Sequence, residues 1–416
     1  MNESLIVRYG DLNLKGKNKK YFVNMANRLI KDKLSSLDVS YIFQGDRVYI
    51  DIKGEKLEDV IKALNHVSGL YSYSLFKRCE LDIKAISEIA LETFDTNHKE
   101  GETFKIEARR PYKNFPYDSY GIMREVSAYI LERREGIKVD VHNPDLSIHV
   151  EIREEGAFVL TKNIMGLGGY PTGCGGKTLL MMSGGIDSPV AAFELIKQGM
   201  TVEIVHFEST PLTSIESAQK VIDLSKKLCA YTRGEKIIVH LVPFKDVHQE
   251  ILAKVNEKYL ITVMRRCMYK IASGIAKRRH ILSIANGESI GQVASQTIES
   301  MNVINEVTMM PVLRPLLIFD KKDIIKVARQ IDTYDISIRP FEDCCTVYVP
   351  KAPVIHPHIK ETLEAEKAGD FGQLIKDAID NTKRILIKED TSLNLESLGF
   401  TVSEALDEYK KQEGEK

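Results

Sequence analysis

The chain has 416 residues, 43% of them hydrophobic, and a formal net charge of −1. At roughly 150 residues per domain, this length predicts two to three domains with enough apolar residues for several cores. No run of 18 apolar residues occurs and the N-terminus is charged rather than signal-like, so we expect a cytoplasmic protein with no membrane segment. The six cysteines lack C-x-x-C spacing, which argues against a disulfide scaffold or a zinc site and favours a reactive thiol.

The first 76 residues alternate between strand and helix patterns. Apolar spacing predicts a strand over 5–8, a helix over 21–34, a hairpin over 41–52, a helix over 57–65 and a strand over 72–76. This order is typical of a ferredoxin-like α/β domain, which we expect over residues 1–76.

A second α/β unit is expected over residues 77–165. Between its first strand and its second helix lies the loop A-R-R-P-Y-K-N-F-P-Y. Basic residues interleaved with aromatic rings can bind phosphates and stack on bases. The predicted RNA contacts are therefore Arg109, Arg110 and Lys113, with an ordinary solvated loop as the alternative.

Residues 166–177 contain six glycines and one cysteine, Cys174. Such a density of glycine predicts a flexible linker and the main domain boundary. From residue 178 strands and helices alternate, which predicts a doubly wound, mainly parallel sheet over 178–396, and a charged tail is expected over 397–416. One long helix is expected over 247–277, and the sequence past Pro357 is expected to be helical.

The segment from Leu179 to Pro189, L-L-M-M-S-G-G-I-D-S-P, places a glycine turn between a buried strand and a helix. Gly184 and Gly185 let main-chain N–H groups converge on an anion, the helix N-terminus adds about half a positive charge, and Ser183 and Ser188 can add hydroxyl donors. Asp187 would repel phosphate unless a cation intervened, so the segment predicts Mg²⁺ on a pyrophosphate. The alternative is an ordinary glycine-rich turn.

A stretch without acidic residues runs from Lys258 to Gly287. Its seven basic residues are Lys258, Arg265, Arg266, Lys270, Lys277, Arg278 and Arg279. A net charge near zero argues against indiscriminate nucleic-acid binding, but this basic stripe indicates a phosphate-rich partner. A solvated helix face is the alternative.

The S-G-G-I-D-S segment resembles the PP-loop of ATP pyrophosphatases, which cleave ATP between its α and β phosphates and adenylate a substrate oxygen. The second unit resembles the THUMP domain, an RNA-binding module of tRNA- and rRNA-modifying enzymes. Together with V-H-F, M-R-R-C-M and D-I-S-I-R-P-F-E-D-C-C, these features make the whole chain similar to the tRNA 4-thiouridine synthetase family.

This resemblance implies an ATP-dependent tRNA sulfurtransferase. The family adenylates O4 of the uridine at tRNA position 8 and replaces the adenylate by sulfur from a cysteine persulfide. The partners that it implies are ATP, Mg²⁺ and tRNA, and we expect a homodimer with no dedicated metal site. Alternatives are a PP-loop ligase that acts on a small molecule and a non-catalytic RNA-binding protein.

The resemblance also assigns residues to the reaction. Asp187 is expected at the metal-pyrophosphate, and Lys321, or else Lys322, is expected to offset the charge of the leaving pyrophosphate. The residues expected to line or approach the nucleotide are Met181, Met182, Ser183, Gly184, Gly185, Ser188, His206, Phe207, Arg265, Gly287 and Gln296.

For the sulfur, the resemblance favours Cys344 as the persulfide carrier, with Cys345 or Cys174 as alternative carriers or resolving thiols. Cys79, Cys229 and Cys267 lie in strand or helix patterns and are expected to be buried and inert. Longer family members append a rhodanese-like domain and this chain ends without one, so we expect direct transfer from a cysteine desulfurase. A secondary role in thiamine thiazole synthesis is left open.

Overall fold

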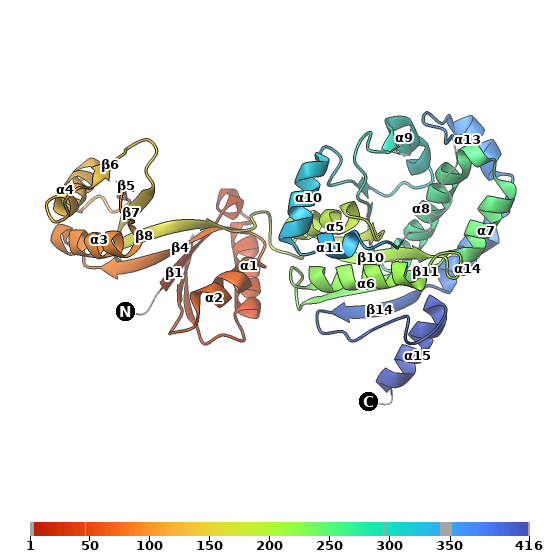
Figure 1. The fold of residues 1–416 in the computed structure, drawn as a ribbon, viewed down its shortest axis with the longest axis horizontal. Helices are drawn as coiled ribbons and strands as arrows, with labels where there is room; N and C mark the ends of the chain where they lie inside the picture. Colours follow the sequence, from red (N-terminus) through yellow and green to blue (C-terminus); the bar gives the residue numbers. More distant parts are fainter. Residues whose placement is uncertain (1–3, 46, 294–295, 342–351, 415–416) are drawn as a thin grey trace. The chain divides into compact units, whose positions relative to one another are not determined.

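The computed structural model describes residues 4–45, 47–293, 296–341 and 352–414. The chain divides into two compact units, residues 1–171 and 172–416, and each is built of strands with packed helices (Figure 1). Within the described ranges, no helix combines the length and the apolar character needed to cross a membrane.

The first unit contains an eight-stranded sheet with the strand order β2-β3-β1-β4-β8-β7-β5-β6. Its strands are β1 (Ser4–Tyr9), β2 (Ser40–Gln44), β3 (Arg47–Asp51), β4 (Leu70–Cys79), β5 (Thr103–Arg109), β6 (Lys138–Val139), β7 (Leu146–Arg153) and β8 (Gly156–Met165). Its helices are η1 (Asp11–Leu14), α1 (Lys19–Lys33), α2 (Leu57–Leu64), α3 (Ile83–Asn97) and α4 (Ser119–Leu131). The order from β1 to β4 confirms the ferredoxin-like expectation.

The two small domains share this one sheet, because β4 pairs with β8. Residues 72–79 of β4 run antiparallel to residues 157–165 of β8, with one irregularity between Ser74 and Phe76. Strand β4 therefore continues past residue 76, where the sequence suggested a domain boundary. Residues 1–171 consequently form a single compact unit.

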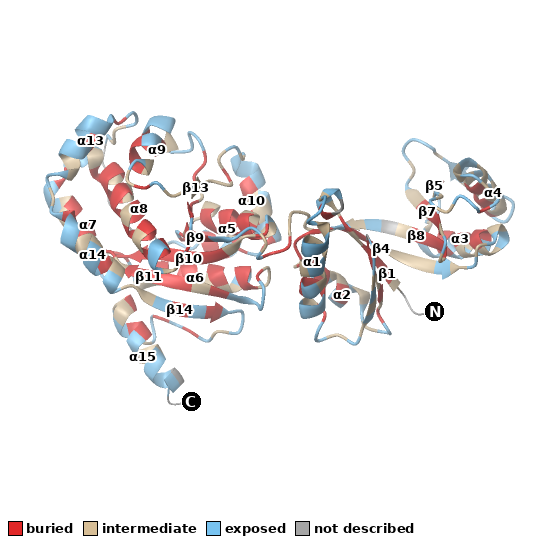
Figure 2. Cartoon of the chain, turned by 180° about the vertical axis from the view of Figure 1, so that it is seen from behind, coloured by how far each residue is buried: buried red, intermediate tan, exposed pale blue. Residues whose placement is uncertain are grey.

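Side chains alternate between the two sides of this sheet, and one side is covered by helices. Leu5 and Val7 of β1 pack with α1 and α2 in one core, and Val150 and Ile152 of β7 pack with α3 and α4 in another. Residues of the opposite parity, such as Arg8, point to the other side of the sheet. Figure 2 shows the buried inner faces of these helices and their exposed outer faces.

The second unit contains a six-stranded sheet in the order β13-β12-β9-β10-β11-β14. Its strands are β9 (Lys177–Met181), β10 (Thr201–Glu208), β11 (Lys236–Pro243), β12 (Ile284–Ala285), β13 (Val312–Leu313) and β14 (Lys383–Lys388). All pairs are parallel except β11 with β14, which confirms a mainly parallel sheet. The chain first adds β10 and β11 on one side of β9 and then β12 and β13 on the other. The switch point of the topology therefore lies between β9 and β12.

Helices cover this sheet because its central strands are apolar on both sides. Ile204 and Val205 are consecutive in β10, and both are fully buried. Helix α8 packs with Leu179 and Val205 on one face. The helices are α5 (Asp187–Lys197), α6 (Ile215–Cys229), α7 (Lys245–Lys254), η2 (Glu257–Tyr259), α8 (Leu260–Arg278), α9 (Ile298–Asn305), α10 (Lys321–Gln330), α11 (Tyr334–Ser337), α13 (Ile359–Glu366), α14 (Phe371–Asp380) and α15 (Val402–Gly414).

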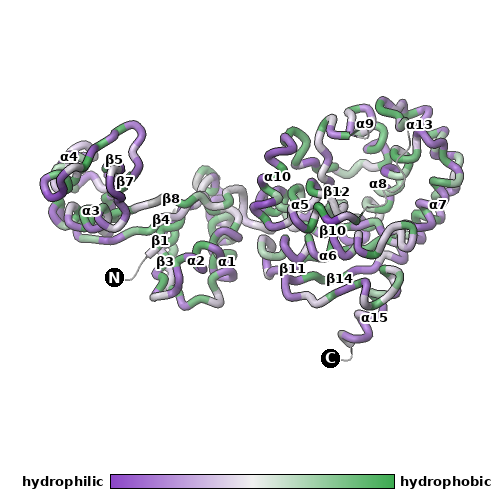
Figure 3. Tube along the Cα trace, in the orientation of Figure 1, coloured by the Kyte–Doolittle hydropathy of each residue, from purple (hydrophilic) through white to green (hydrophobic). Residues whose placement is uncertain are grey.

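Three expectations about these elements were wrong. The helix expected over 247–277 is interrupted after α7, because Asn256 accepts a hydrogen bond from Lys258 N and starts η2 there. Past Pro357 the chain also forms strand β14, which pairs with β11. Residues 402–414 of the expected charged tail form α15, which buries Ala405 and Leu406 and otherwise consists mostly of hydrophilic residues (Figure 3).

The glycine-rich segment that was expected to be a flexible linker is hydrogen-bonded instead. Gly69 N donates to Gly168 O at 2.7 Å, and beyond residue 171 Gly173 N and Gly175 N both donate to Gly199 O at 2.8 Å. A Cβ at Gly166 would lie 2.4 Å from Leu70 O, so this close approach requires glycine. The division between the two units, at residues 171 and 172, lies inside this segment.

Candidate active site

The S-G-G-I-D-S turn connects β9 to α5 at the switch point of the sheet. Ser183 N donates to Ser188 Oγ at 3.2 Å, and Ser188 Oγ donates to Ser183 O at 2.8 Å. Gly185 N donates to Ser183 Oγ at 3.4 Å. The two serines, which were expected to offer hydroxyl donors to an anion, thus hold the turn closed in this structure.

At Gly185 the turn leaves open space, whereas Gly184 is buried. Gly184 and Gly185 are not among the described glycines with positive φ. A Cβ at Gly185 would have Ser183 Oγ as its neighbour, at 3.5 Å, which is an ordinary contact. The missing side chain therefore keeps the surface of the turn clear for a ligand, next to the N-terminus of α5.

Asp187, the first residue of α5, is held by two side chains from distant parts of the chain. Lys321 Nζ, at the start of α10, donates to Asp187 Oδ1 at 2.5 Å. Gln292 Nε2 donates to Asp187 Oδ2 at 3.1 Å. The structure thus brings together Asp187 and Lys321, and it adds Gln292, which the sequence analysis missed because nothing local distinguishes this glutamine.

Gly287 follows β12 and packs against the turn across the switch point. A Cβ on Gly287 would lie 2.9 Å from both Asp187 C and Ser188 N. Such distances are shorter than real Cβ contacts, and both neighbours are main-chain atoms. Gly287 therefore contributes to the site by allowing two backbones to approach each other.

Arg265 of α8 binds the buried carboxylate of Glu288, the residue that follows Gly287. Glu288 accepts from Arg265 and from Arg314 Nε, the latter at 2.6 Å. Burial alone would raise the pKa of Glu288, but the charges of Arg265 and Arg314 outweigh it and lower this pKa below its usual range. Two guanidinium groups thus share one carboxylate next to Gly287. Arg314 directly follows β13 and was not predicted.

Met182 and His206 lie at the ends of neighbouring strands. His206 Nδ1 is 3.0 Å from Met182 O, and because a carbonyl oxygen can only accept, Nδ1 carries the hydrogen. His206 is 2% exposed, and its Nε2 has no hydrogen-bond partner among the described residues. An unpaired buried acceptor is costly, so this nitrogen is suited to a donor on a ligand.

The remaining predicted nucleotide residues have structural contacts. Phe207 is buried against Phe244, with ring centroids 5.4 Å apart, and Met181 packs on the core beneath α8. Gln296 Oε1 accepts from Ser289 N at 3.4 Å, and Gln296 O accepts from Gly291 N at 3.0 Å. Gln296 therefore holds the loop that carries Gln292.

The basic stripe, which was expected to contact a phosphate-rich partner, is compensated within the chain for most of its length. Its charges are paired with carboxylates from other segments, because folding brings acidic residues to a stretch that has none. Arg266, only 2% exposed, binds Glu306 and Glu366. The other pairs are Lys270 with Glu366, Arg278 with Asp380 and Arg279 with Glu203.

Of the three predicted RNA contacts, Arg109 and Lys113 are exposed and Arg110 is partly engaged. Arg110 Nη1 donates to Lys113 O and to Phe115 O, both at 2.9 Å. This arginine therefore holds the shape of the loop that presents its neighbours.

Further arginines lie on the side of the sheet opposite α1 and α2. Arg47 Nη1 and Arg153 Nη2 bind the buried Glu151, at 3.0 and 2.7 Å. Burial lowers the pKa of Arg8, and the charges of Arg47 and Arg109 lower it further, although Glu151 acts in the opposite direction. Arg47 and Arg153 thus pair with one carboxylate, and Arg8 interacts electrostatically with Glu151, Arg47 and Arg109. We call these four residues the arginine cluster (Arg8, Arg47, Arg109 and Arg153).

Cys344 and Cys345 lie outside the described residues. Cys229 and Cys267 are buried, as expected, and Cys79 is partly buried. Burial raises the pKa of Cys267 to about 12 and that of Cys79 to about 11, so neither is a ready thiolate. Cys174 is partly exposed.

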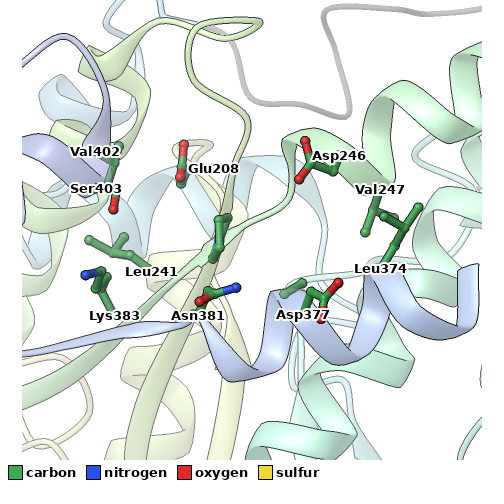
Figure 4. Close-up of a pocket in the computed structure, with 12 residues that line it drawn as sticks. Glu208, Leu241, Asp246, Val247, Leu374, Asp377, Asn381, Lys383, Val402 and Ser403 are labelled. Carbon is green, nitrogen blue, oxygen red and sulfur yellow. The ribbon is translucent and has the colours of Figure 1, made fainter.

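A separate pocket of about 280 Å³ lies beyond the ends of β10 and β11 (Figure 4). Its lining includes Glu208, Asp246, Asp377 and Lys383. Burial raises the pKa of Glu208. None of the predicted site residues lines this pocket, so it is not the proposed phosphate cradle.

Comparison with known proteins identifies the family. Profiles described as ThiI ferredoxin-like domain, THUMP domain and Thiamine biosynthesis protein (ThiI) match residues 4–74, 80–162 and 173–371. A probable tRNA sulfurtransferase of Acholeplasma laidlawii is 45% identical over 412 residues, which cover 99% of this chain and 100% of the relative. This chain belongs to the ThiI family of tRNA sulfurtransferases. The expected family and domain folds are thereby confirmed.

Other ThiI relatives agree. A probable tRNA sulfurtransferase of Geobacillus thermodenitrificans is 46% identical over 389 residues, or 93% of this chain and 96% of the relative. A crystal structure of a 4-thiouridine synthetase–RNA complex with bound ATP matches with a TM-score of 0.80 and 35% identity, covering 93% of this chain and 100% of that chain. PH1313 from Pyrococcus horikoshii, at 24% identity and a TM-score of 0.58, shares the fold. ThiI membership makes this chain an enzyme that transfers sulfur to tRNA.

Proposed function

We propose that this chain uses ATP to adenylate O4 of the uridine at tRNA position 8. The outer sulfur of a persulfide on Cys344 then attacks C4 and displaces AMP. A second thiol, Cys345 or Cys174, next attacks the Cys344 sulfur, so that a disulfide forms as the S–S bond to the base breaks and 4-thiouridine is released; a thiol reductant such as the added cysteine restores the two thiols. The observation that carries this proposal is the glycine turn at the switch point, where Asp187 is held by Lys321 and Gln292. The related structure with RNA and bound ATP supports the same chemistry here.

The turn and its surroundings fit ATP. The N-terminus of α5 and the open surface above Gly185 suit phosphate groups. The unpaired Nε2 of His206 suits a hydrogen-bond donor of adenosine at the carboxyl end of β10. Arg265 and Arg314 place two guanidinium groups at the same edge of the sheet, where such groups favour an anion.

Mg²⁺ fits this site as a partner of the nucleotide. Among the described residues, no group of three or more His, Cys, Asp or Glu side chains could hold a metal by itself. Mg²⁺ is commonly held by one or two carboxylates together with phosphate oxygens, and Asp187 would supply one carboxylate. When bound, the ion would offset negative charge on the departing pyrophosphate.

Different residues of the chain would then act in adenylation and in sulfur transfer. Asp187 faces the pyrophosphate position, Lys321 supplies a positive charge beside it, and Gln292 keeps the Asp187 carboxylate oriented. Stabilising charge that develops in the transition state is commonly the largest contribution to catalysis. Cys344 would receive its sulfur from a cysteine desulfurase and deliver it to the activated base.

For tRNA, we propose that the arginine cluster and the basic loop form one surface of the first unit. Arg109 belongs to both the cluster and the loop. It is the last residue of β5, next to the loop, and its charge lowers the pKa of Arg8. Clustered guanidinium groups favour a polyanion, and the exposed Lys113 extends the same surface.

A reconstituted reaction tests the proposal. Unmodified tRNA, ATP, Mg²⁺, cysteine and a desulfurase are incubated with the protein, and the nucleosides are analysed by mass. We expect 4-thiouridine and AMP in equal amounts, and neither product from a tRNA that carries cytidine at position 8. Formation of no 4-thiouridine in the complete mixture would refute the function. Exchange of pyrophosphate into ATP that does not depend on tRNA would favour a ligase acting on a small molecule.

A further inference from the structure

The pocket beyond the ends of β10 and β11 contains a buried carboxylate with one unused oxygen. Glu208, the last residue of β10, lines this pocket and is 6% exposed. Its Oε2 accepts from Thr210 N at 2.8 Å and from Thr210 Oγ1 at 2.6 Å. Its Oε1 accepts no hydrogen bond from the part of the chain that the structure describes. A buried carboxylate oxygen without a donor is costly, so Oε1 is suited to a donor on a ligand.

The contacts of Glu208 fix the direction of this carboxylate. Thr210 Oγ1 donates to Glu208 and also accepts from Val402 N, at the start of α15, at 3.3 Å. The main chain is held as well, because Glu208 O accepts from Phe244 N at 2.7 Å. A ligand would therefore meet a carboxylate that is already oriented, which lowers the entropic cost of binding.

Two further carboxylates line the same pocket. Asp246 lies in the first turn of α7 and Asp377 lies near the end of α14, and both residues are exposed. Figure 4 shows Glu208 and Asp246 along one side of the pocket, with Asn381 and Asp377 along the other. A ligand in this pocket would thus have carboxylates on two sides.

The basic residues nearby do not balance these carboxylates. Lys383 lines the pocket, but its Nζ already binds Asp407 at 2.8 Å. Lys245 acts on Glu208 electrostatically, yet burial outweighs this effect and the pKa of Glu208 is raised. The excess of negative charge favours a cationic ligand.

The apolar part of the lining narrows the class of cation. Leu241, Val247, Leu374 and Ala378 lie alongside the carboxylates. Among the described residues, no group of three or more His, Cys, Asp or Glu side chains could hold a metal ion, so these carboxylates do not converge on one point. Separated carboxylates with apolar neighbours match a chain of methylene groups that carries ammonium groups at intervals. The pocket volume of about 280 Å³ lies near the lower end of small-molecule sites, roughly 300 Å³.

We propose that this pocket binds an aliphatic amine with two or more ammonium groups, that is, a polyamine. One ammonium group donates to Glu208 Oε1, others face Asp246 and Asp377, and the methylene groups contact the apolar lining. None of the residues assigned to the phosphate cradle lines this pocket, so the proposal does not depend on the reaction at Asp187.

Binding of spermidine to the full chain tests the proposal. Isothermal titration calorimetry is performed at constant ionic strength without tRNA or ATP, because both are anions that bind polyamines themselves. Wild type should show saturable binding at one site per chain. Glu208→Gln keeps the size of the side chain and should weaken this binding about tenfold or more, since it removes a buried charged acceptor. Asp246→Asn, at an exposed position, should weaken it about threefold.

Matched controls separate this site from general attraction of cations. Glu389→Gln removes the same charge at an exposed position outside the pocket and should match wild type. Hexylamine has one ammonium group on an apolar chain, and Mg²⁺ has two charges without a chain. Both should bind about tenfold more weakly than spermidine, because each lacks part of the proposed contacts.

Three results would overturn the proposal. They are no saturable binding of spermidine to wild type, equal affinities of wild type and a folded Glu208→Gln, and equal affinities for Mg²⁺ and spermidine. Far-ultraviolet circular dichroism reports whether each variant folds. If Glu208→Gln does not fold, Asp246→Asn decides in its place, and an affinity equal to that of Glu389→Gln then counts against the site.

Discussion

Lys321 Nζ lies 2.5 Å from Asp187 Oδ1, so the start of α10 neutralises a carboxylate at the start of α5. Without such a partner, a carboxylate beside the N–H groups of the glycine turn would compete with a phosphate ligand. In the proposed reaction, Lys321 would already lie where negative charge develops when pyrophosphate leaves. The sequence left open whether Lys321 or Lys322 serves the pyrophosphate. The contact with Asp187 favours Lys321.

We expect Asp187→Ala to slow adenylation strongly while tRNA binding stays near wild type. The loss of one transition-state contact of this kind costs on the order of 3 kcal/mol, or about 10² to 10³ in rate. Single-turnover formation of adenylated tRNA measures the first effect, and a filter-binding assay measures the second. Adenylation at the wild-type rate would show that the cradle has been assigned wrongly.

Lys321→Met and Lys322→Met form a matched pair. Lys321→Met should slow adenylation about 10²-fold, because it removes the ammonium group beside Asp187. Lys322→Met should leave the rate near wild type, since Lys322 is exposed on the same turn of α10. Equal effects of the two substitutions on the single-turnover rate would contradict the role given to Lys321.

Gly287→Ala and Gly185→Ala should fail in different ways. The new Cβ at position 287 meets main-chain atoms of Asp187 and Ser188 at 2.9 Å, so the turn must move, at a cost of about 1–3 kcal/mol. The Cβ at position 185 meets Ser183 Oγ at 3.5 Å and projects into the space proposed for phosphate. Gly287→Ala should therefore lower both the thermal midpoint and ATP affinity, whereas Gly185→Ala should lower ATP affinity alone. Calorimetry and equilibrium dialysis together test this distinction.

Arg109 and Arg110 should affect tRNA binding through different properties. For Arg109→Ala, the slope of log affinity against log salt should fall by about 0.7 to 0.9, with the thermal midpoint unchanged. Arg110→Ala removes the bonds to Lys113 O and Phe115 O and should destabilise the first unit by about 1–2 kcal/mol. An unchanged salt slope in Arg109→Ala would place the tRNA surface elsewhere.

The buried Glu203 should make stability depend on acid pH. Burial alone would raise its pKa, but hydrogen bonds from His240 and Arg279 outweigh burial and lower the pKa to about 2. The ionised form therefore stabilises the folded state above the unfolded pKa of about 4.3, and this stabilisation is lost as the pH falls toward 2. Glu203→Gln should be less stable than wild type at pH 6, and the difference should shrink between pH 4.5 and pH 3. A constant difference in thermal midpoint across this range would contradict the argument.

Much of this protein follows from local sequence patterns. The alternation of apolar residues predicts the ferredoxin-like order of β1 to β4 and the mainly parallel second sheet. The S-G-G-I-D-S spacing predicts a turn between β9 and α5 with a carboxylate at its end. These features are accessible because a strand, a turn and a helix start depend on residues close together in the chain.

Tertiary structure alone decided which distant groups meet. Gln292 and Lys321 converge on Asp187 across 105 and 134 residues, and Glu366 and Asp380 neutralise much of a stripe whose own sequence contains no acidic residue. Burial of Lys220 beneath Arg339 and Phe341 has no local signature either. Charge pairing and close packing depend on distance in space, and the spacing of residues along a chain sets that distance only within one turn or one strand.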